Sequence, residues 1–334
     1  MRDVAALAGV SPKTVSNVVN GGVSVRPETR ARVEDAVRRL DYRPNLSARG
    51  LRNGRTGAIA LAFPDLATPY SAEMVHVFVE VAHDRGWSVQ IEQTGTRPER
   101  EHDLLYRGKE HLVDGLVLNP VTLDASAIAG ADTLPPVVVI GEVEQTLVDQ
   151  VGVDSVAAAR DMTLHLAALG HRRIAVLGPF PPGADTASAR ARTHGWRLAL
   201  QEAGLEHDPS LSIEVDEWSS PGAASAVRVL IARGGPLPDA IFCFTDSLAI
   251  GALHALAAAG VDVPGDVSVA GFDDVADGRF AVPAITTVSF DKWLFAERTL
   301  ELLADRVADR QGDPVLVRIP YRIVDRASTA ARSR

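Results

Sequence analysis

Apolar strand patterns alternate with amphipathic helix patterns along the chain from Gly57 onward. The apolar segments form a first set, GAIALAF, WSVQIEQ, GLVLN, PVVVIG and QVGVD, and a second set, RIAVLG, LSIEVD, AIFCF and VSVAGF. Between them, helices are expected near residues 69–85, 98–111, 155–169, 187–203, 221–233 and 246–259. Nearly continuous apolar strands joined by helices predict two parallel, doubly wound sheets with helices on both faces. Two such sets predict two similar lobes with a ligand cleft between them, at the carboxyl ends of the strands.

The last part of the chain is expected to return to the first lobe. A helix over about 291–310 and the strand PVLVRIP fit that lobe, so the chain crosses between the lobes more than once. The first lobe then comprises about 57–153 and 289–320, and the second about 154–288. Hinged closure of the lobes on a small molecule is the motion expected of such an α/β body.

Several classes of protein are excluded by composition. No apolar run approaches the roughly 18 to 20 residues that a membrane span requires. No cationic stretch followed by an apolar core begins the sequence, so no secretory signal is expected. Cys243 is the single cysteine, which excludes an internal disulfide and a cysteine-based zinc site. Its apolar setting predicts an inert buried thiol, and a cytoplasmic protein is expected.

Charge is divided unequally along the chain. Residues 1–55 contain eleven basic and five acidic residues, a balance of about +6, whereas the whole chain of 334 residues carries a formal charge of −9. The remainder therefore carries about −15. This division predicts a basic module attached to an acidic body. On charge alone, the basic residues fit a solvated surface and a phosphate-binding surface equally well.

Three short amphipathic helices are predicted in the basic module. Their apolar stripes are formed by Val4, Leu7 and Ala8, by Val15, Val18 and Val19, and by Val33, Ala36, Val37 and Leu40. Gly9 is suited to end the first helix because glycine adopts a positive φ without strain. Ser11 can cap the second helix, and Pro12 fits its first position. Two helices joined by a tight turn and braced by a third form a helix-turn-helix.

The exposed side of the second helix carries short polar groups. The DNA-binding residues expected there are Ser11, Pro12, Lys13, Thr14, Ser16 and Asn17. Such groups can reach base edges and phosphates when a helix lies in the major groove. A small helical bundle used for protein contact is the alternative, and the polar face favours DNA binding over it.

The stretch YRPNLSARGLRNGRT follows the third helix. Pro44 ends that helix, and Asn45 can cap a new helix from Leu46 to about Leu51 that is too short to be stable alone. Leu51 is flanked by arginines, and a leucine wedged between base steps of the minor groove has this chemistry. From composition alone, a flexible basic linker is slightly favoured over a hinge helix.

The segments DVAALAGVSPKTVSNVVNG and TRARVEDAVRRLDYRPNLSARGLR closely resemble the LacI/GalR family of bacterial transcription regulators, and the resemblance extends over essentially the whole chain. It implies that Pro12, Lys13 and Asn17 read bases and that Leu51 is the intercalating leucine. A hinge helix over 45–52 would then form when two copies sit side by side on an operator. Its implied DNA contacts are Asn45, Ala48, Arg49, Leu51 and Arg52.

The resemblance implies three parts of the chain. They are a helix-turn-helix DNA-binding domain (1–44), a hinge helix and linker (45–56), and an effector-binding and dimerisation domain (57–334) with the architecture of periplasmic sugar-binding proteins. Three departures from the family pattern are expected to matter, and one is a start before Asp3 that is several residues shorter than in most relatives. Asn17 stands where arginine is common, and an amide suits adenine better than guanine. Arg26 replaces the usual cap of the third helix, at a cost of about 1 kcal/mol.

Polar and aromatic residues at strand ends are the candidate effector contacts: Asp65, Tyr70, Arg192, Trp218, Thr245, Asp246 and Asp273. Asp246 also fits a helix cap, Trp218 a packing role between helices, and Arg192 an ordinary ion pair. The resemblance implies that Arg192 grips effector oxygens, that Asp273 accepts from effector hydroxyls and that Trp218 flanks the effector. Thr245 stands where many relatives have asparagine. Carboxylates, arginine and an aromatic floor fit a sugar, and a purine-type ligand is the alternative.

The remaining alternatives are a glycoside-processing enzyme and a non-regulatory sugar-binding protein. Asp273 and Asp274 are adjacent, so their side chains tend to diverge rather than flank one bond. No nucleophile signature, phosphate loop, dinucleotide turn or metal spacing is present, so no catalytic residue, cofactor or metal is expected. The prediction is a homodimeric transcriptional repressor that binds a near-palindromic operator and is controlled by a sugar.

Overall fold

The computed structural model describes residues 1–19, 25–42, 55–95, 97–107, 113–121, 135–181 and 186–332. The chain divides into two compact units, Met1–Gly57 and Ala58–Arg334. The hinge residues expected to contact DNA (Asn45, Ala48, Arg49, Leu51 and Arg52) lie outside the described residues. Within the described ranges, no helix combines the length and apolarity needed to cross a membrane.

The N-terminal unit contains helices α1 (Arg2–Ala8), α2 (Pro12–Val19) and α3 (Pro27–Arg39). Val4, Val15 and Val33, one from each helix, are fully buried in a common small core. Gly9 ends α1 at φ 65°, and the Ser11 hydroxyl accepts the Thr14 N–H at 3.1 Å, so both helix signals are confirmed. Leu7 and Leu40, which the pattern placed on apolar stripes, are 43% and 44% exposed. Ala5 lies inside instead, because the short helices pack closely through small residues.

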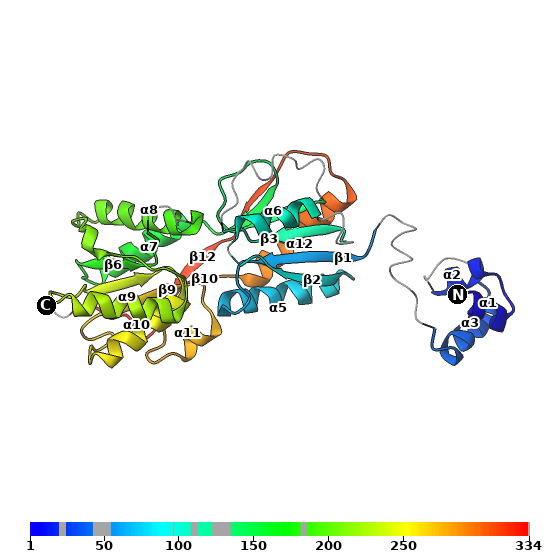
Figure 1. The fold of residues 1–334 in the computed structure, drawn as a ribbon, viewed down its shortest axis with the longest axis horizontal. Helices are drawn as coiled ribbons and strands as arrows, with labels where there is room; N and C mark the ends of the chain where they lie inside the picture. Colours follow the sequence, from blue (N-terminus) through cyan, green and yellow to red (C-terminus); the bar gives the residue numbers. More distant parts are fainter. Residues whose placement is uncertain are drawn as a thin grey trace. The chain divides into compact units, whose positions relative to one another are not determined.

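The first sheet of the body contains six strands in the order β11-β5-β4-β3-β1-β2. Their bounds are β1 (Ala58–Phe63), β2 (Ser88–Gln93), β3 (Gly115–Leu118), β4 (Val137–Ile140), β5 (Asp149–Gly152) and β11 (Leu316–Arg318), and all neighbours are parallel. Its helices are α5 (Pro69–Asp84), α6 (Pro98–Arg107) and α12 (Lys292–Ala308). Figure 1 shows helices on both faces of this sheet.

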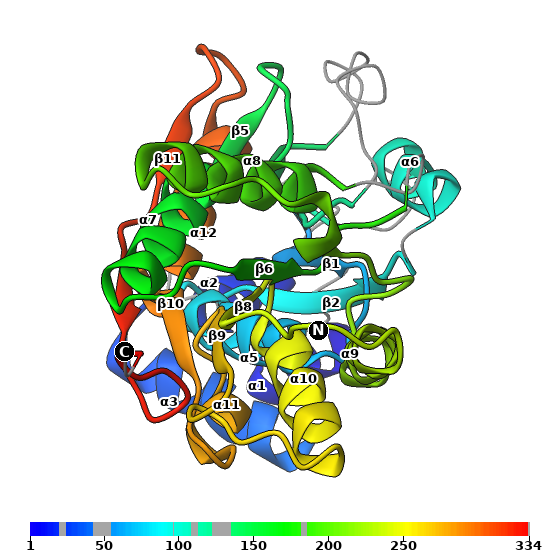
Figure 2. The ribbon, with the colours of Figure 1, turned by 90° about the vertical axis from the view of Figure 1, so that its left-hand side faces the viewer.

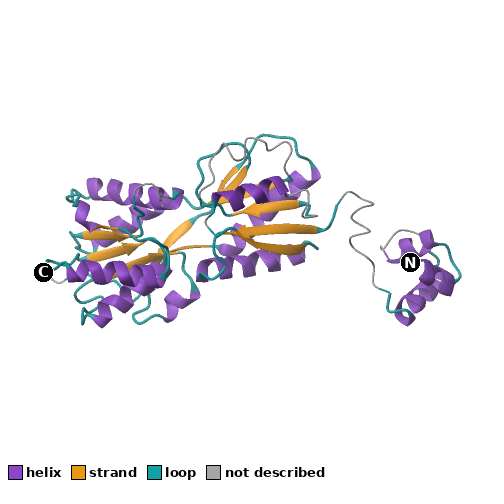
Figure 3. Ribbon diagram, viewed as in Figure 1, coloured by secondary structure: helices purple, strands orange, loops and turns teal. Residues whose placement is uncertain are grey.

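The second sheet has the order β12-β10-β9-β8-β6-β7. Its strands are β6 (Ile174–Leu177), β7 (Ser212–Ile213), β8 (Ala240–Cys243), β9 (Ser268–Phe272), β10 (Thr286–Phe290) and β12 (Tyr321–Val324). The associated helices are α7 (Ser155–Ala168), α8 (Ala187–Glu202), α9 (Ser220–Ala232), α10 (Asp246–Ala258) and the short α11 (Ala276–Phe280). Helices α7 and α8 pack together, as do α9 and α10 (Figure 2). Figure 3 shows the resulting helix–sheet–helix layers.

The predicted α/β architecture is confirmed, with three further elements. The chain passes from the first sheet to the second after β5, returns after β10, and passes over again after β11, as expected for a chain that crosses more than once. Strands β10 and β12 and helix α11 were not predicted. Because β12 runs antiparallel to β10, it adds an antiparallel edge strand to an otherwise parallel sheet.

Asp149 fixes the returning segment against the first sheet. Its fully buried carboxylate receives two hydrogen bonds from Arg306 of α12, at 2.7 and 2.9 Å, and one from the Val315 N–H at 2.8 Å. A buried carboxylate requires such partners, because an unpaired charge is costly to remove from water. This ion pair therefore joins α12 and the approach to β11 to the start of β5.

Candidate functional site

Arg192 is buried on α8, with a side chain that faces the aromatic residues of the second lobe. Its guanidinium carbon lies 3.7 Å from the ring centre of Phe272 and 5.4 Å from that of Trp218. One nitrogen donates to the Phe244 carbonyl, and Nε lies 3.4 Å from the Ser155 hydroxyl. Aromatic faces attract a desolvated cation. Arg192 is therefore held as a fixed cation, and no acidic side chain forms an ion pair with it in the described part of the chain.

The position of Arg192 depends on close approach of α8 to α7. A Cβ atom at Gly195 would lie 2.2 Å from the Val156 carbonyl oxygen, so glycine is required where the two helices meet. Trp196 follows, fully buried, and its Nε1 donates to the Ile174 carbonyl at 3.0 Å. These contacts explain why glycine and tryptophan stand three and four residues after Arg192.

Trp218 combines packing with proximity to Arg192. Its Nε1 donates to the Gly178 carbonyl at 2.7 Å, and its ring stacks on Phe180 with centroids 5.7 Å apart. The ring is only partly buried. The ring of Trp218 therefore lies beside Arg192, and its orientation is fixed by the hydrogen bond to the backbone at the end of β6.

Asp273 lies directly after β9 with φ 108°, in the left-handed region. Its side chain is 5% exposed, and no other described residue forms a hydrogen bond with its carboxyl group. Burial raises the pKa of Asp273 to about 8; Asp246 and Glu142 add to the rise, and Arg192 opposes it. A nearly buried carboxyl group that receives no hydrogen bond from the described chain is a candidate for contact with a ligand.

Glu142 was missed in the sequence and belongs to this site. It follows β4 of the first lobe and accepts hydrogen bonds from the hydroxyls of Ser155 and Ser188, the latter at 2.6 Å, at the starts of α7 and α8. The rule that identified Asp65, a polar residue just after a parallel strand, also identifies Glu142 in VVVIGE. Burial and the charges of Asp273 and Glu142 raise the pKa of Tyr70, so its phenol is within electrostatic range of both carboxyl groups.

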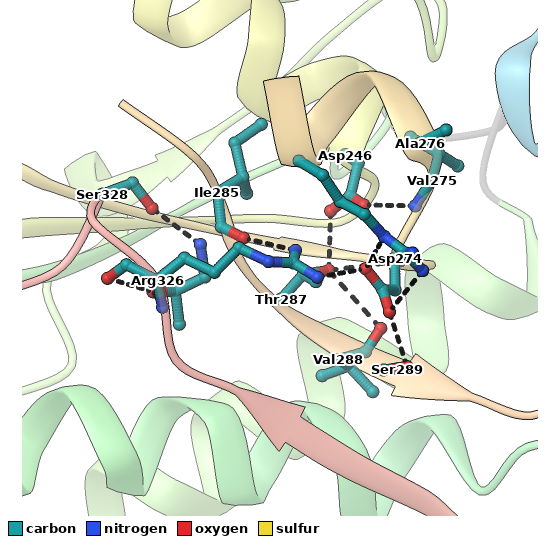
Figure 4. Close-up of polar contacts among 12 residues, drawn as sticks. Asp246, Asp274, Val275, Ala276, Ile285, Thr287, Val288, Ser289, Arg326 and Ser328 are labelled. Carbon is teal, nitrogen blue, oxygen red and sulfur yellow. Dashed lines mark hydrogen bonds and ion pairs between the residues drawn. The ribbon is translucent and has the colours of Figure 1, made fainter. Parts of the chain in front are cut away.

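Three of the predicted contacts are engaged in hydrogen bonds with other parts of the chain. Asp65 accepts from the Ala67 N–H at 2.9 Å within its own loop. Thr245, and not Asp246, caps α10, because its hydroxyl accepts the Leu248 N–H at 3.2 Å. The cap prediction for Asp246 is therefore wrong. Its carboxyl group is fully buried and receives the Thr287 hydroxyl at 2.6 Å and the Val275 N–H at 2.9 Å (Figure 4).

Asp274, unlike its neighbour Asp273, has several hydrogen-bond partners for its side chain. Its oxygens accept hydrogen bonds from Arg326 at 2.5 Å and Ser289 at 2.8 Å (Figure 4). Arg279 donates two more, at 3.1 and 3.2 Å. Burial tends to raise the pKa of Asp274, but these donors outweigh it, and the pKa is lowered. Asp274 is thus a fixed anion that holds the turn beside Asp273. In the described ranges, no three His, Cys, Asp or Glu side chains are grouped as metal ligands would be.

The second candidate site is the outer face of α2. Lys13 and Asn17 are exposed, whereas Val15 and Val18 on the opposite face are buried. Ser11 and Pro12 are also exposed at the helix start, and Thr14 and Ser16 are half-buried. The base-reading residues expected from the sequence therefore lie on the accessible side of the helix.

Two family models match the chain. One is described as "Bacterial regulatory proteins, lacI family" and matches residues 1–45, and the other is described as "Periplasmic binding protein-like domain" and matches residues 163–329. The HTH-type transcriptional regulator CelR of Thermobifida fusca is 34% identical over 97% of this chain and 96% of its own length.

Solved structures agree with these matches over the whole chain. A transcriptional regulator CelR–cellobiose complex is 30% identical with a TM-score of 0.72, and a Lac repressor dimer bound to operator and the anti-inducer ONPF is 29% identical with a TM-score of 0.86. Each comparison covers 98% of both chains.

Proposed function

The chain belongs to the LacI family of bacterial regulatory proteins, and we propose that it is a transcriptional repressor that binds operator DNA and is controlled by a sugar. The observation that carries the effector assignment is the buried, unpartnered carboxyl group of Asp273, near an arginine fixed between aromatic rings. The outer face of α2 supplies the DNA contacts.

Sugar hydroxyls match the polar groups around Arg192 and Asp273. They can donate to Asp273 and Glu142 and accept from Arg192, and charged partners make such hydrogen bonds strong. The partly buried rings of Trp218 and Tyr70 offer apolar faces to the ring carbons of a sugar. A relative was solved with cellobiose, so a β-linked glucose disaccharide is the first compound to test.

DNA binding is proposed to involve two copies of the chain. A relative binds its operator as a dimer, and a two-fold symmetric dimer reads a near-palindromic site. The basic charge of residues 1–55 favours phosphate contact, whereas the acidic remainder of the chain disfavours it. Lys13 and Asn17 would face base edges, and residues 45–52 would form the hinge helix whose Leu51 enters the minor groove.

Control requires that the sugar bind two arrangements of the lobes unequally, because a ligand shifts an equilibrium only by its differential affinity. Closure of the cleft around the sugar would change the spacing between the two hinge segments of a dimer. That spacing decides whether both Leu51 side chains can wedge into DNA.

The proposal is tested by a thermal-shift screen of sugars, beginning with cellobiose, followed by titration of the operator complex with each compound that binds. Asp273→Ala and Arg192→Ala are expected to retain operator binding and to lose the response to the sugar. Leu51→Ala is expected to show the reverse, with weakened operator binding and an intact sugar affinity. Equal loss of both activities in all three variants, or chemical turnover of the bound sugar, would contradict the proposal.

A further inference from the structure

Glu73 of the first lobe forms one hydrogen bond to the second lobe and one, with Lys292, within its own lobe. It lies on α5, and one carboxylate oxygen accepts the Ala276 N–H of α11 at 2.6 Å. The other oxygen lies 2.7 Å from Nζ of Lys292, the first residue of α12. The two side chains are 30% and 12% exposed, respectively. Both charges are thus largely withdrawn from water, which strengthens the interaction relative to an open surface pair.

Lys292 extends this connection to the turn that carries Asp273. Its ammonium group donates a second hydrogen bond, of 2.9 Å, to the main-chain carbonyl of Asp274. Asp273 and Asp274 both have positive φ, at 108° and 49°. Non-glycine residues keep such conformations only where surrounding contacts hold them. The Lys292 bond is one of the contacts that hold this turn.

The two ends of the connection are adjacent to proposed effector residues. Tyr70 precedes Glu73 by three residues on α5, about one helical turn away on the same face. Asp273 is joined directly to Asp274. Tyr70 belongs to the first lobe and Asp273 to the second, so Glu73 and Lys292 link two sides of the cleft through a short chain of hydrogen bonds.

We propose that Lys292 is a positioning residue that ties α5 to the Asp273–Asp274 turn and thereby sets the closure of the two lobes before any effector is bound. The significance of Tyr70 and Asp273 rests on the proposed function, whereas the tether itself does not. When the tether is broken, the lobes separate more readily, and a smaller fraction of the protein has the closed cleft. The apparent affinity for an effector that binds only the closed form then falls in proportion to the closed fraction.

A purely local role is the alternative. In that case, loss of the pair would lower the unfolding temperature and leave the distance between the lobes unchanged. The pair between Arg298 and Glu301, at 2.8 Å, provides a matched comparison because both of its residues lie on α12 and it joins no second element.

The test measures the distance between the lobes in the full-length, ligand-free protein by electron spin resonance. Spin labels are attached to Glu80→Cys on α5 and Ala257→Cys on α10, which are both exposed. Cys243 is fully buried, so the labels attach to the introduced thiols. Lys292→Met is expected to shift the distance distribution to longer values or to add a longer component. Lys292→Arg, which retains the charge and donors, is expected to restore the wild-type distribution, and Arg298→Gln is expected to leave it unchanged.

Glu73→Gln provides a second, shape-conserving test that keeps the proposal falsifiable if Lys292→Met does not fold. It weakens the same tether and is expected to shift the distribution in the same direction. The proposal is overturned if the folded variants of Lys292 and Glu73 superimpose on the wild type, or if Arg298→Gln produces the same shift. No DNA or sugar enters this measurement, so its failure leaves the repressor assignment intact, and failure of the sugar screen leaves the tether intact.

Discussion

The guanidinium carbon of Arg192 lies 3.7 Å from the centre of the Phe272 ring, with Trp218 at 5.4 Å. Arg192 and Phe272 come from different elements, α8 and β9, and their contact requires the close packing of α8 on α7. A planar cation fixed in this way keeps hydrogen-bond donors in a constant direction, which is the requirement for recognising oxygen atoms of a ligand.

Arg192→Lys is expected to weaken effector binding by about tenfold or more, although the positive charge is conserved. The ammonium group has neither the planar surface that stacks on Phe272 nor the forked donors, and contacts of this kind contribute about 1–2 kcal/mol when desolvated. Isothermal titration with the sugar found by screening measures the loss. Arg197→Lys, an exposed residue of the same helix, is the control and is expected to bind normally. Equal affinity of the Arg192 variant and wild type for the sugar would show that Arg192 does not contact the effector.

Effector affinity is expected to rise with pH between about 6 and 8 and to level off above. Burial raises the pKa of Asp273 to about 8 in the ligand-free protein. Sugar hydroxyls that donate to the ionised carboxylate lower that pKa, so binding releases a proton below pH 8. Asp273→Asn is expected to bind more weakly and to lose this pH dependence. A wild-type affinity that is flat across this range would show that Asp273 does not accept from the ligand.

The same carboxyl group makes the free energy of unfolding depend on pH. Its pKa in the folded protein is raised above the value of about 4 for an unfolded chain, so the unfolded state binds fewer protons between pH 4 and 8. The ligand-free body should therefore become less stable as the pH rises through this window. Urea titrations at several pH values measure the free energy of unfolding of wild type and Asp273→Asn. The variant is expected to lose less stability per pH unit between pH 4 and 8. An identical pH dependence of the two proteins would contradict the raised pKa.

Asp149→Ala is expected to reduce the free energy of unfolding of the body by about 3–5 kcal/mol, because it leaves Arg306 without its buried partner. Asp149 is fully buried and bonded to Arg306 at 2.7 and 2.9 Å. Glu301→Ala removes an exposed pair on the same helix and should cost less than about 1 kcal/mol. Urea denaturation followed by tryptophan fluorescence compares the two. Similar small losses would indicate that the returning segment is held by other contacts.

The exposed residues of α2 should separate into two functional kinds. Asn17→Ala is expected to cost about 1–3 kcal/mol on the best operator and to relax the base preference at one position of each half-site. A Lys13 contact to phosphate would instead weaken binding to all sequences, and Lys13→Ala would reduce the dependence on salt by about one ion. Competition binding at several salt concentrations distinguishes them. An Asn17 variant with unchanged sequence preference would contradict base reading by this helix.

The alternation of apolar segments and helix patterns was sufficient to predict most strands and helices of the body, because its central strands consist almost entirely of apolar residues. Strand β10 was missed because its buried face includes hydroxyl groups. Thr287 and Ser289 are buried only because their hydroxyls bond to Asp246 and Asp274, and partners this distant along the chain leave no local pattern. Strand β12 pairs only with β10, in an antiparallel direction. Because the predicted sheet did not contain β10, it offered no neighbour for β12, and β12 was missed as well.

The candidate site was predicted in outline for a similar reason. The ends of parallel strands converge, so the sequence predicted Asp273 as a candidate, and the structure has it directly after β9. The same rule covers Glu142, which was overlooked. Glu73 had no such signal, since it lies within a helix and its partner Lys292 is 219 residues away. The cap role predicted for Asp246 was wrong because its position after a strand says nothing of the direction of its side chain, which faces Thr287 and Val275.

The central claim is that the N-terminal unit reads a specific DNA sequence and that a sugar in the cleft controls this. It is tested most directly by selecting fragments of bacterial genomic DNA with the full-length protein at one fixed salt concentration, with and without each sugar of the screen. The account predicts enrichment of one near-palindromic sequence, loss of that enrichment in Asn17→Ala, and a change in it when the effector is added. Recovery of no enriched sequence under any condition would contradict the account.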